Sequence, residues 1–339
     1  MINMNNKPLI GILLGDATGV GPELIAKLVA SGKAQEKSRS VVIGDVRVLR
    51  QGMEFAGVDF PMNVVNALEE CTFGDVIDVW DQHNCSPDDY TVGQVCVSAA
   101  KAAMETRIMC LDLCAAGKLD GLMIAPINKE GMKKAGYMYE DGIRLAKAHL
   151  NIKERCGEIN IIDGLWTTRV TSHIPLRDVC DTLTVDNIYE TIKFAYDCMT
   201  KSGYNAPRIG VTGLNPHNGE NGLCGDEEIT KIAPAIERAR AEGMIVDGPF
   251  PADTVFVKAF NDHNFDIIVT MYHDQGQIAM KMKNFYDIAT LQGGLPFPVA
   301  TPAHGTSYSR AGKGTANTGS TFSTYDSVCA IAARKYESK

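Results

Sequence analysis

The sequence lacks long apolar runs, basic clusters and a recognisable export signal. No stretch approaches the roughly 18–20 apolar residues that span a bilayer. The amino end, Met-Ile-Asn-Met-Asn-Asn-Lys-Pro, has neither the apolar core nor the cleavage site of a signal peptide. The formal net charge is −8, and no run of Lys or Arg is long enough to follow a phosphate backbone. We therefore expect a cytoplasmic protein that binds neither membranes nor nucleic acid.

Paired cysteine motifs are also missing. The chain has 10 cysteines, but they are scattered and none forms a Cys-x-x-Cys pair. Cys110 and Cys114 lie one helical turn apart in an apolar segment. This distribution excludes a zinc finger and predicts buried, reduced thiols in a reducing compartment.

What the chain contains is an alternation of strand and helix patterns on an ordinary globular composition. Its 339 residues are 45% hydrophobic and 22% charged, which is enough for a substantial core. Apolar runs predict strands over 8–14, 41–43, 76–80 and 121–125, and helices over 22–34, 47–56, 91–117, 129–135, 185–202, 226–242, 254–261 and 325–336. This order predicts an α/β fold with helices on both faces of a sheet.

Three histidines stand at or just past the ends of apolar or β-branched runs. His173 follows the run 167–172, His217 follows 208–214 and His273 follows 266–272. In α/β proteins the carboxyl ends of strands bind ligands, and three imidazoles without cysteine are typical of a catalytic metal site with an open position. A single histidine at a strand end is more often a hydrogen-bonded structural residue than a ligand, and three in equivalent positions leave both interpretations open.

Two glycine-rich loops are candidates for anion or cofactor binding. The loop Gly15–Glu23 follows the first predicted strand and opens the first helix, where backbone N–H groups bind anions. It matches neither the dinucleotide fingerprint nor the P-loop, so a simple tight turn remains an alternative. The loop 304–314 is rich in glycine and donors and is able to lie against a dinucleotide.

Taken together, these motifs make the chain resemble the 4-hydroxythreonine-4-phosphate dehydrogenase family of pyridoxal phosphate biosynthesis. The resemblance extends over nearly the whole length, and its strings occur in the family's order. They are Gly15-Asp16-x-x-Gly19-x-Gly21-Pro22-Glu23, Ala125-Pro126-x-x-Lys129, Ser172-His173-x-Pro175-Leu176-Arg177-Asp178, Gly213-Leu214-Asn215-Pro216-His217-x-Gly219-Glu220, Gly248-Pro249-x-Pro251-Ala252-Asp253-Thr254, Met271-Tyr272-His273-Asp274-Gln275-Gly276, Gly294-Leu295-Pro296-Phe297 and His304-Gly305-Thr306.

The resemblance implies a two-lobed α/β fold like that of isocitrate and isopropylmalate dehydrogenases, with mixed sheets flanked by helices. Residues 1–140 and 290–339 would form one lobe and 141–289 the other, with a cleft between them. It also implies a homodimer whose active site is shared between the subunits. The activity it implies is the NAD-dependent oxidation of a secondary hydroxyl of a small hydroxy acid, followed by decarboxylation of the keto acid.

The resemblance assigns roles to particular residues. One divalent metal (zinc, cobalt, manganese, nickel or magnesium) would be held by His173, His217 and His273. Lys281 would bind an anionic group or take part in proton transfer, and Asp253 and Asp274 would orient ligands or relay protons. NAD would lie near His304, Gly305, Thr306 and Gly312.

The sequence departs from the family at the substrate contacts. Gly142 and Ile143 stand where the family has a His-Thr pair, Thr290 replaces an asparagine and Val299 replaces an arginine. These changes remove charge-assisted donors that suit phosphate, so we hypothesise an altered substrate, and the apolar replacements favour a less phosphorylated, ring-shaped hydroxy acid.

Several alternatives stay open. The substrate is either 4-phosphohydroxy-threonine, a sugar-acid 4-phosphate (threonate or erythronate) or a carboxylated cis-dihydrodiol, and Arg144 is a candidate replacement cation for a phosphorylated one. A non-catalytic small-acid binding protein and a metal-dependent hydrolase are rivals from other classes.

Overall fold

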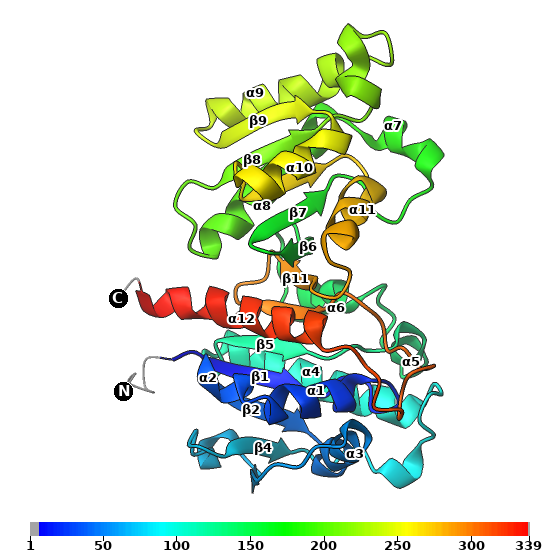
Figure 1. The fold of residues 1–339 in the computed structure, drawn as a ribbon, viewed down its shortest axis with the longest axis vertical. Coiled ribbons are helices and arrows are strands. Elements are labelled where there is room, and N and C mark those ends of the chain that lie inside the picture. The colour runs from blue at the N-terminus through cyan, green and yellow to red at the C-terminus, as the bar shows by residue number, and fades with distance from the viewer. Residues whose placement is uncertain (1–6, 338–339) are drawn as a thin grey trace. The chain divides into compact units, whose positions relative to one another are not determined.

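The computed structural model describes residues 7–337 and divides into two compact units. Unit 1 comprises Met1–Cys156 and Tyr286–Lys339, and unit 2 comprises Gly157–Phe285. Both units are α/β, as the strand and helix patterns predict (Figure 1). The unit boundaries differ from the sequence-based ones, because residues 141–156 and 286–289 belong to unit 1.

Unit 1 is built on a mostly parallel sheet with the strand order β3-β4-β2-β1-β5-β12-β11. Its strands are β1 (Leu9–Leu13), β2 (Arg39–Gly44), β3 (Met62–Val65), β4 (Ile77–Asp81), β5 (Gly121–Ile124), β11 (Ala289–Gly293) and β12 (Val299–Pro302). Only β11 and β12 pair antiparallel, with Thr290 opposite Thr301. Because a parallel sheet is covered on both faces, β1 is buried along its whole length.

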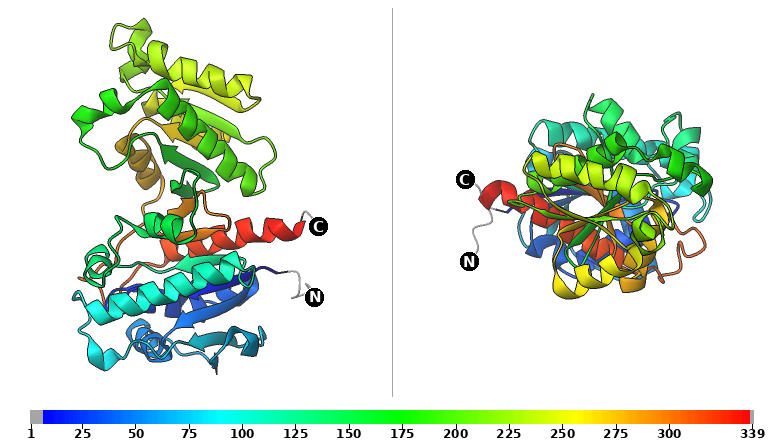
Figure 2. Two further views of the ribbon diagram at one scale, coloured as in Figure 1. Left: turned by 180° about the vertical axis from the view of Figure 1, so that it is seen from behind. Right: turned by 90° about the horizontal axis from the view of Figure 1, so that it is seen from above.

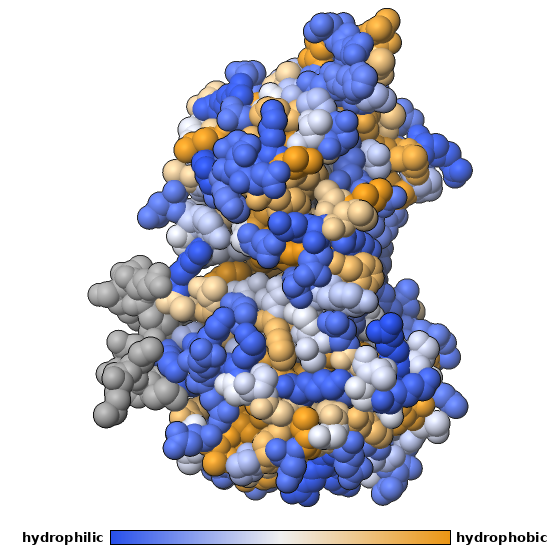
Figure 3. Space-filling model, viewed as in Figure 1, coloured by the Kyte–Doolittle hydropathy of each residue, from blue (hydrophilic) through white to orange (hydrophobic). Residues whose placement is uncertain are grey.

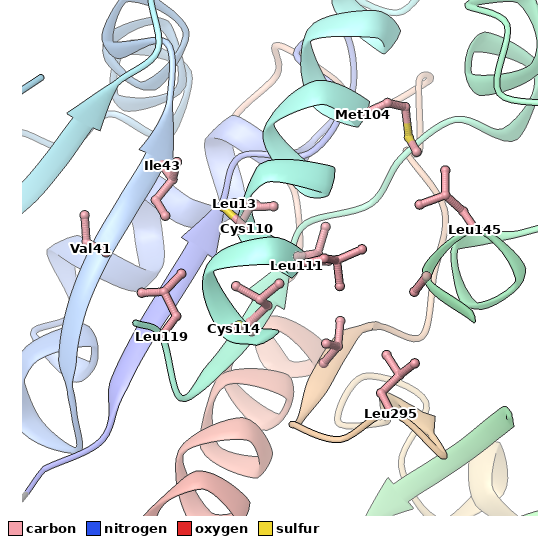
Figure 4. Packing of buried hydrophobic residues seen from close by; sticks show 14 of the residues in the cluster. Leu13, Val41, Ile43, Met104, Cys110, Leu111, Cys114, Leu119, Leu145 and Leu295 are labelled. Atoms are coloured by element: carbon pink, nitrogen blue, oxygen red, sulfur yellow. The ribbon is translucent and has the colours of Figure 1, made fainter. Parts of the chain in front are cut away.

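Helices lie on both faces of the unit 1 sheet (Figures 1 and 2). They are α1 (Gly21–Ala30), α2 (Lys33–Glu36), α3 (Val46–Ala56), α4 (Val97–Ala115), α5 (Lys129–Lys134), α6 (Gly142–His149) and α12 (Gly319–Glu337). Helix α4 packs on β1, β2 and β5, and its Met104, Cys110 and Leu111 are fully buried in the main core cluster (Figure 4). Short 3-10 turns occur at Leu68–Glu70 and Pro87–Asp89.

Unit 2 has a five-stranded sheet in the order β6-β7-β10-β8-β9. Its strands are β6 (Gly157–Ile162), β7 (Leu165–Arg169), β8 (Arg208–Thr212), β9 (Ile245–Phe250) and β10 (Ile267–Thr270). Strands β6 and β7 form an antiparallel hairpin whose two turn residues, Asp163 and Gly164, both have positive φ, as a two-residue Asp-Gly turn requires. The other strands run parallel.

Helices cover both faces of this second sheet as well. They are α7 (Val179–Thr182), α8 (Val185–Lys201), α9 (Ala233–Ala241), α10 (Ala252–Asp262) and α11 (His273–Lys283), with a 3-10 turn at Leu176–Asp178, a turn segment at Pro216–Asn221 and a π-helical turn at Glu228–Ile232. Figure 1 shows α10 and α11 in front of the sheet, and the view from behind in Figure 2 shows α8 on the other face. No helix in the described part of the chain has the length and apolarity to cross a membrane.

The structure shifts several predicted element bounds for local reasons. The helix predicted from 91 starts at Val97, because Gly93 has a φ of 81° and the preceding residues form turns. The helix predicted over 22–34 is divided into α1 and α2 at Gly32, which has a φ of 77°. Each break therefore falls at or near a glycine in the left-handed region.

The cysteine prediction is confirmed only in part. None of the ten cysteines, all within the described residues, forms a disulfide. Cys110, Cys114, Cys198 and Cys329 are buried, but Cys180 and Cys224 are exposed. The expectation of buried thiols was therefore wrong for these two positions, and Cys71, Cys85, Cys96 and Cys156 are only partly buried.

Candidate active site

The three histidines follow three neighbouring parallel strands of unit 2. Strand β10 pairs with β7 on one side and with β8 on the other, and all three run in the same direction. His173 follows β7, His217 follows β8, and His273 is the first residue of α11 after β10. The sheet therefore delivers all three imidazoles to the same edge, where α/β proteins bind ligands.

Two of the imidazoles lie close together. The ring centroids of His173 and His273 are 5.9 Å apart, with an angle of 45° between the ring planes. Nδ1 of His273 lies 2.7 Å from Oδ1 of Asp274, so Nε2 is the ring nitrogen that remains for a ligand. A carboxylate on the other ring nitrogen is the usual arrangement around a metal-bound histidine.

The segment that carries His217 has an unusual backbone. Residues 217–222 all have positive φ, between 44° and 94°, and several of them are not glycine. The His217 ring is 71% exposed, and its Nδ1 lies 2.8 Å from Oε1 of Glu220. Each non-glycine residue in this region costs about 1–2 kcal/mol, so the surrounding structure must hold the segment in place.

Glu228 is the buried group that holds this segment. Its Oε1 accepts the backbone N–H groups of Leu214 and Asn215, both at 2.7 Å, and its Oε2 accepts Nδ2 of Asn215 at 3.0 Å. A Cβ on Gly213 or Gly219 would come within 2.9 Å of its carboxylate oxygens. The two glycines therefore allow the carboxylate to reach the chain on either side of His217.

Gln275 joins the start of α11 to the end of β8. Its Oε1 accepts the N–H of Met271 at 2.8 Å, and its Nε2 donates to the carbonyl of Gly213 at 2.9 Å. Sequence reasoning assigned no role to Gln275 or Glu228. For Gln275 a signal existed, because the string His-Asp-Gln-Gly contains it. For Glu228 there was none, because it is one of several acidic residues in 226–228.

The three histidines have the chemistry of metal ligands, but not all three lie close together. Within residues 7–337 no group of three or more His, Cys, Asp or Glu side chains is close enough to hold a metal ion. His173 and His273 converge, and His217 and His273 each present a ring whose Nδ1 is held by a carboxylate. The chemistry of these rings suits a divalent cation, but one chain does not gather all three.

A large pocket of unit 2 adjoins two of the histidine segments. Its volume is about 870 Å³. His217, Asp253 and Asp274 line it, so it brings together both carboxylates predicted to be catalytic. Its apolar lining includes Phe256, Val257, Phe260, Ile278, Ala279 and Met282. Lys281 lies on α11 and is exposed.

The two glycine loops meet in unit 1. The N–H of Val20 donates to the carbonyl of Thr306 at 3.0 Å, and a Cβ on Gly19 would lie 2.9 Å from Thr306. The hydroxyl of Tyr308 donates to the buried Asp16 at 2.9 Å, and burial raises the pKa of Tyr308 to about 12. The loop 304–314 is therefore fixed beside the end of β1.

Three of the predicted cofactor contacts, His304, Gly305 and Gly312, lie in different local surroundings. Nδ1 of His304 lies 2.9 Å from the carbonyl of Gly305, and Gly305 has open space around its Cα. Gly312, with a φ of 74°, packs near Val92 and Phe55. Of the four predicted contacts, Gly305 is exposed, His304 and Gly312 are partly buried, and Thr306 is buried.

The four altered substrate positions all belong to unit 1. Val299 is fully buried and pairs with Leu122 across β12 and β5, and Ile143 is 4% exposed. Thr290 lies on β11, and Gly142 begins α6. Packing in the core thus accounts for the apolar character of Val299 and Ile143.

Comparison with known proteins gives consistent results. The family model described as "Pyridoxal phosphate biosynthetic protein PdxA" matches residues 36–327. The chain is 40% identical to the "Putative 4-hydroxythreonine-4-phosphate dehydrogenase 2" of Pseudomonas aeruginosa, covering 98% of this chain and 100% of that one. It is 37% identical to the "Putative D-threonate 4-phosphate dehydrogenase" of Oceanobacillus iheyensis, covering 92% and 94%.

Solved structures agree with the sequence relatives. The crystal structure of 4-hydroxythreonine-4-phosphate dehydrogenase from Klebsiella pneumoniae superposes with a TM-score of 0.86 at 34% identity, covering 96% of this chain and 99% of that one. A terephthalate 1,2-cis-dihydrodiol dehydrogenase from Burkholderia xenovorans shares the fold, with a TM-score of 0.63 at 24% identity. The strings around the three histidines, the family match and these relatives lead to one conclusion: the chain belongs to the PdxA family.

Proposed function

We propose that this protein is a dehydrogenase that oxidises the secondary hydroxyl of a small phosphorylated hydroxy acid and passes the hydride to NAD. The observation that carries the proposal is the delivery of three histidines to one edge of the unit 2 sheet by β7, β10 and β8. Membership of the PdxA family and the names of its relatives support the reaction type.

The residues that would hold a divalent metal are His173, His217 and His273. When bound there, the metal would lower the pKa of the substrate hydroxyl and stabilise the alkoxide that expels hydride. Zinc, cobalt, manganese, nickel and magnesium are the candidates. The chain itself supplies the orientation, because Asp274 and Glu220 each hold Nδ1 of a neighbouring imidazole.

Charged side chains beside the histidines would handle the substrate's charges and protons. Lys281 lies two helical turns after His273 on α11 and would bind an anionic group, or would protonate the enolate left when a β-keto acid product loses carbon dioxide. Asp253 lines the same pocket as Asp274 and would relay protons. In unit 1 the loop around His304 and Gly305 would contact NAD.

The substrate proposal is tested by NAD reduction with three kinds of acid. We expect turnover of D-threonate 4-phosphate or 4-phosphohydroxy-threonine at an ordinary enzymatic rate of about 1–10³ s⁻¹. The carboxylated cis-dihydrodiol is expected to react at least about a hundredfold more slowly. Faster turnover of the dihydrodiol would reverse the substrate assignment. Binding of the acids without NAD reduction would favour a binding protein.

We further propose that two copies of the chain form a homodimer through the apolar surface of α10 and α11. The exposed apolar residues there are Val257, Ile278 and Met282, which are 58%, 62% and 81% exposed. They share the pocket lined by His217 and Asp274, on a face where apolar patches interrupt the hydrophilic surface (Figure 3). Large exposed apolar patches commonly mark interfaces, and a second copy would also complete a ligand set that one chain does not gather.

Ile278→Glu is expected to convert the dimer into a monomer, because it places a charge in the apolar contact. The sedimentation coefficient of the full chain measures this change directly. Val64→Glu is the matched control, since Val64 is an exposed apolar residue (41%) of unit 1 and its variant should remain dimeric. A wild-type protein that sediments as a monomer at micromolar concentration would refute the dimer.

A further inference from the structure

Arg107 is a buried cation, and no carboxylate of residues 7–337 lies within salt-bridge distance of it. It lies on α4 and is 3% exposed. Its Nη2 donates to two neutral acceptors, the carbonyl of Gly142 and Oε1 of Gln292, both at 2.8 Å. Its Nε has no hydrogen-bond partner among the described residues. Proteins rarely bury a charge in this way unless something else compensates it.

Burial acts on the guanidinium strongly. It lowers the pKa of Arg107 to about 10, and the charge of Asp141 offsets this effect only in part. The carboxylate of Asp141 is already used, because its Oδ1 caps α6 by accepting the N–H of Arg144 at 2.8 Å. The guanidinium therefore stays charged at neutral pH, and the residues around it do not fully compensate its positive charge.

Gly142 leaves the space that the guanidinium occupies. A Cβ on Gly142 would lie 2.3 Å from Nη1 and 2.5 Å from Cζ and Nη2 of Arg107. Gly142 has no positive φ, so its backbone conformation does not require glycine. The requirement comes from Arg107, which fills the position that a side chain at residue 142 would take.

The guanidinium also lies beside β11. Gln292 is 5% exposed and receives the hydrogen bond from Arg107. Thr290 lies two residues before Gln292 on the same strand, so both side chains point to the same face of the sheet. Arg107 thus lies where the start of α6 and the side chains of β11 meet.

We propose that Arg107 is a substrate-binding residue that pairs with an oxyanion of the substrate, its carboxylate or its phosphate, beside Gly142 and Gln292. This inference rests on the proposed function, in which the substrate is a small anionic hydroxy acid. A guanidinium is suited to the role because its planar set of donors matches carboxylate and phosphate oxygens. An oxyanion of the substrate would supply the negative charge that compensates the buried guanidinium of Arg107.

The test compares Arg107→Gln with wild-type protein in two measurements, steady-state kinetics and direct binding by calorimetry. The probes are threonate, threonate 4-phosphate and a tetritol 4-phosphate without a carboxylate. We expect Arg107→Gln to raise KM and Kd about 10- to 100-fold for the probes that carry the recognised group, with a smaller change in kcat. Loss of affinity for threonate identifies the carboxylate, and loss confined to phosphorylated probes identifies the phosphate.

Two further variants separate binding from folding. Gly142→Ala keeps the charge but displaces the guanidinium, and it should raise the same constants if Arg107→Gln does not fold. Arg50→Gln removes an exposed arginine of α3 and should change neither constant. Unchanged KM and Kd in folded Arg107→Gln, with only a lower melting temperature, would overturn the inference.

The outcomes also separate this inference from the proposed function. If wild-type protein binds the probes without reducing NAD and Arg107→Gln weakens that binding, the proposed function fails and the inference stands. If wild-type protein reduces NAD and Arg107→Gln does so with the same KM, the inference alone fails. If wild-type protein neither binds nor oxidises any probe, both are wrong.

Discussion

His273→Ala is expected to remove the bound metal and to lower kcat/KM by at least about 10²–10³-fold, the loss seen when a group that stabilises a developing oxyanion is removed. The position of the ring is the reason. His273 starts α11 three residues past the end of β10, its ring lies 5.9 Å from that of His173, and Asp274 holds its Nδ1. Removing the ring removes a ligand from the centre of the proposed set.

Metal content by elemental analysis and NAD reduction by absorbance check this prediction on the same preparation. Asp274→Asn should retain the ring but weaken metal affinity about 10- to 100-fold, as expected for a group that orients a ligand. His149→Ala is the matched control, because His149 lies on α6 in unit 1 and pairs with Asp112. Normal metal content and activity in His273→Ala would refute the proposed metal site.

Glu228→Ala is expected to destabilise unit 2 and to release the segment that carries His217. The variant leaves the N–H groups of Leu214 and Asn215 without their acceptor, and each unsatisfied buried group costs about 1–3 kcal/mol. Because Leu214 and Asn215 are only partly buried, the total is roughly 2–4 kcal/mol. The chain that leads into the positive-φ backbone of residues 217–222 would then have lost these hydrogen bonds.

Urea unfolding and limited proteolysis measure the two effects separately. We expect an earlier unfolding midpoint and new cleavage within 214–225 of Glu228→Ala, with intermediate behaviour for Glu228→Gln, which keeps one acceptor. Glu237→Ala, at an exposed position of α9, should stay within about 0.5 kcal/mol of wild type. Resistance of the 214–225 segment to cleavage in Glu228→Ala would show that other contacts hold it.

The sequence predicted that the three histidines follow neighbouring strands because those signals are local, and the metal set that they would form stays a prediction. Each histidine lies three to five residues past the end of a short strand, and parallel neighbours bring strand ends together without further information. The strands β3, β6, β9, β11 and β12 were not predicted. Length does not explain this, because β5 has only four residues and was predicted, but the pairing of β12 depends on β5, which lies far along the chain. The same long-range pairing places residues 286–289 in unit 1.

The surroundings of the substrate positions could not be predicted, because they depend on tertiary packing. Val299 looked like a lost contact in the sequence, yet it is a fully buried residue of β12. Arg107 looked like an ordinary residue of a long helix, and only the fold brings it against Gly142, 35 positions away. A charge that the sequence lacks at one position can thus come from another element.

Deuterium transfer tests the central claim most directly. The wild-type, metal-loaded protein is given D-threonate 4-phosphate or 4-phosphohydroxy-threonine deuterated at its secondary carbinol carbons, together with NAD, and the nucleotide is analysed by mass spectrometry. A hydride-transferring dehydrogenase must produce reduced nucleotide one mass unit heavier, in step with consumption of the acid. Consumption of the acid without deuterium in the nucleotide, or no reduced nucleotide from either acid, would contradict the proposed function.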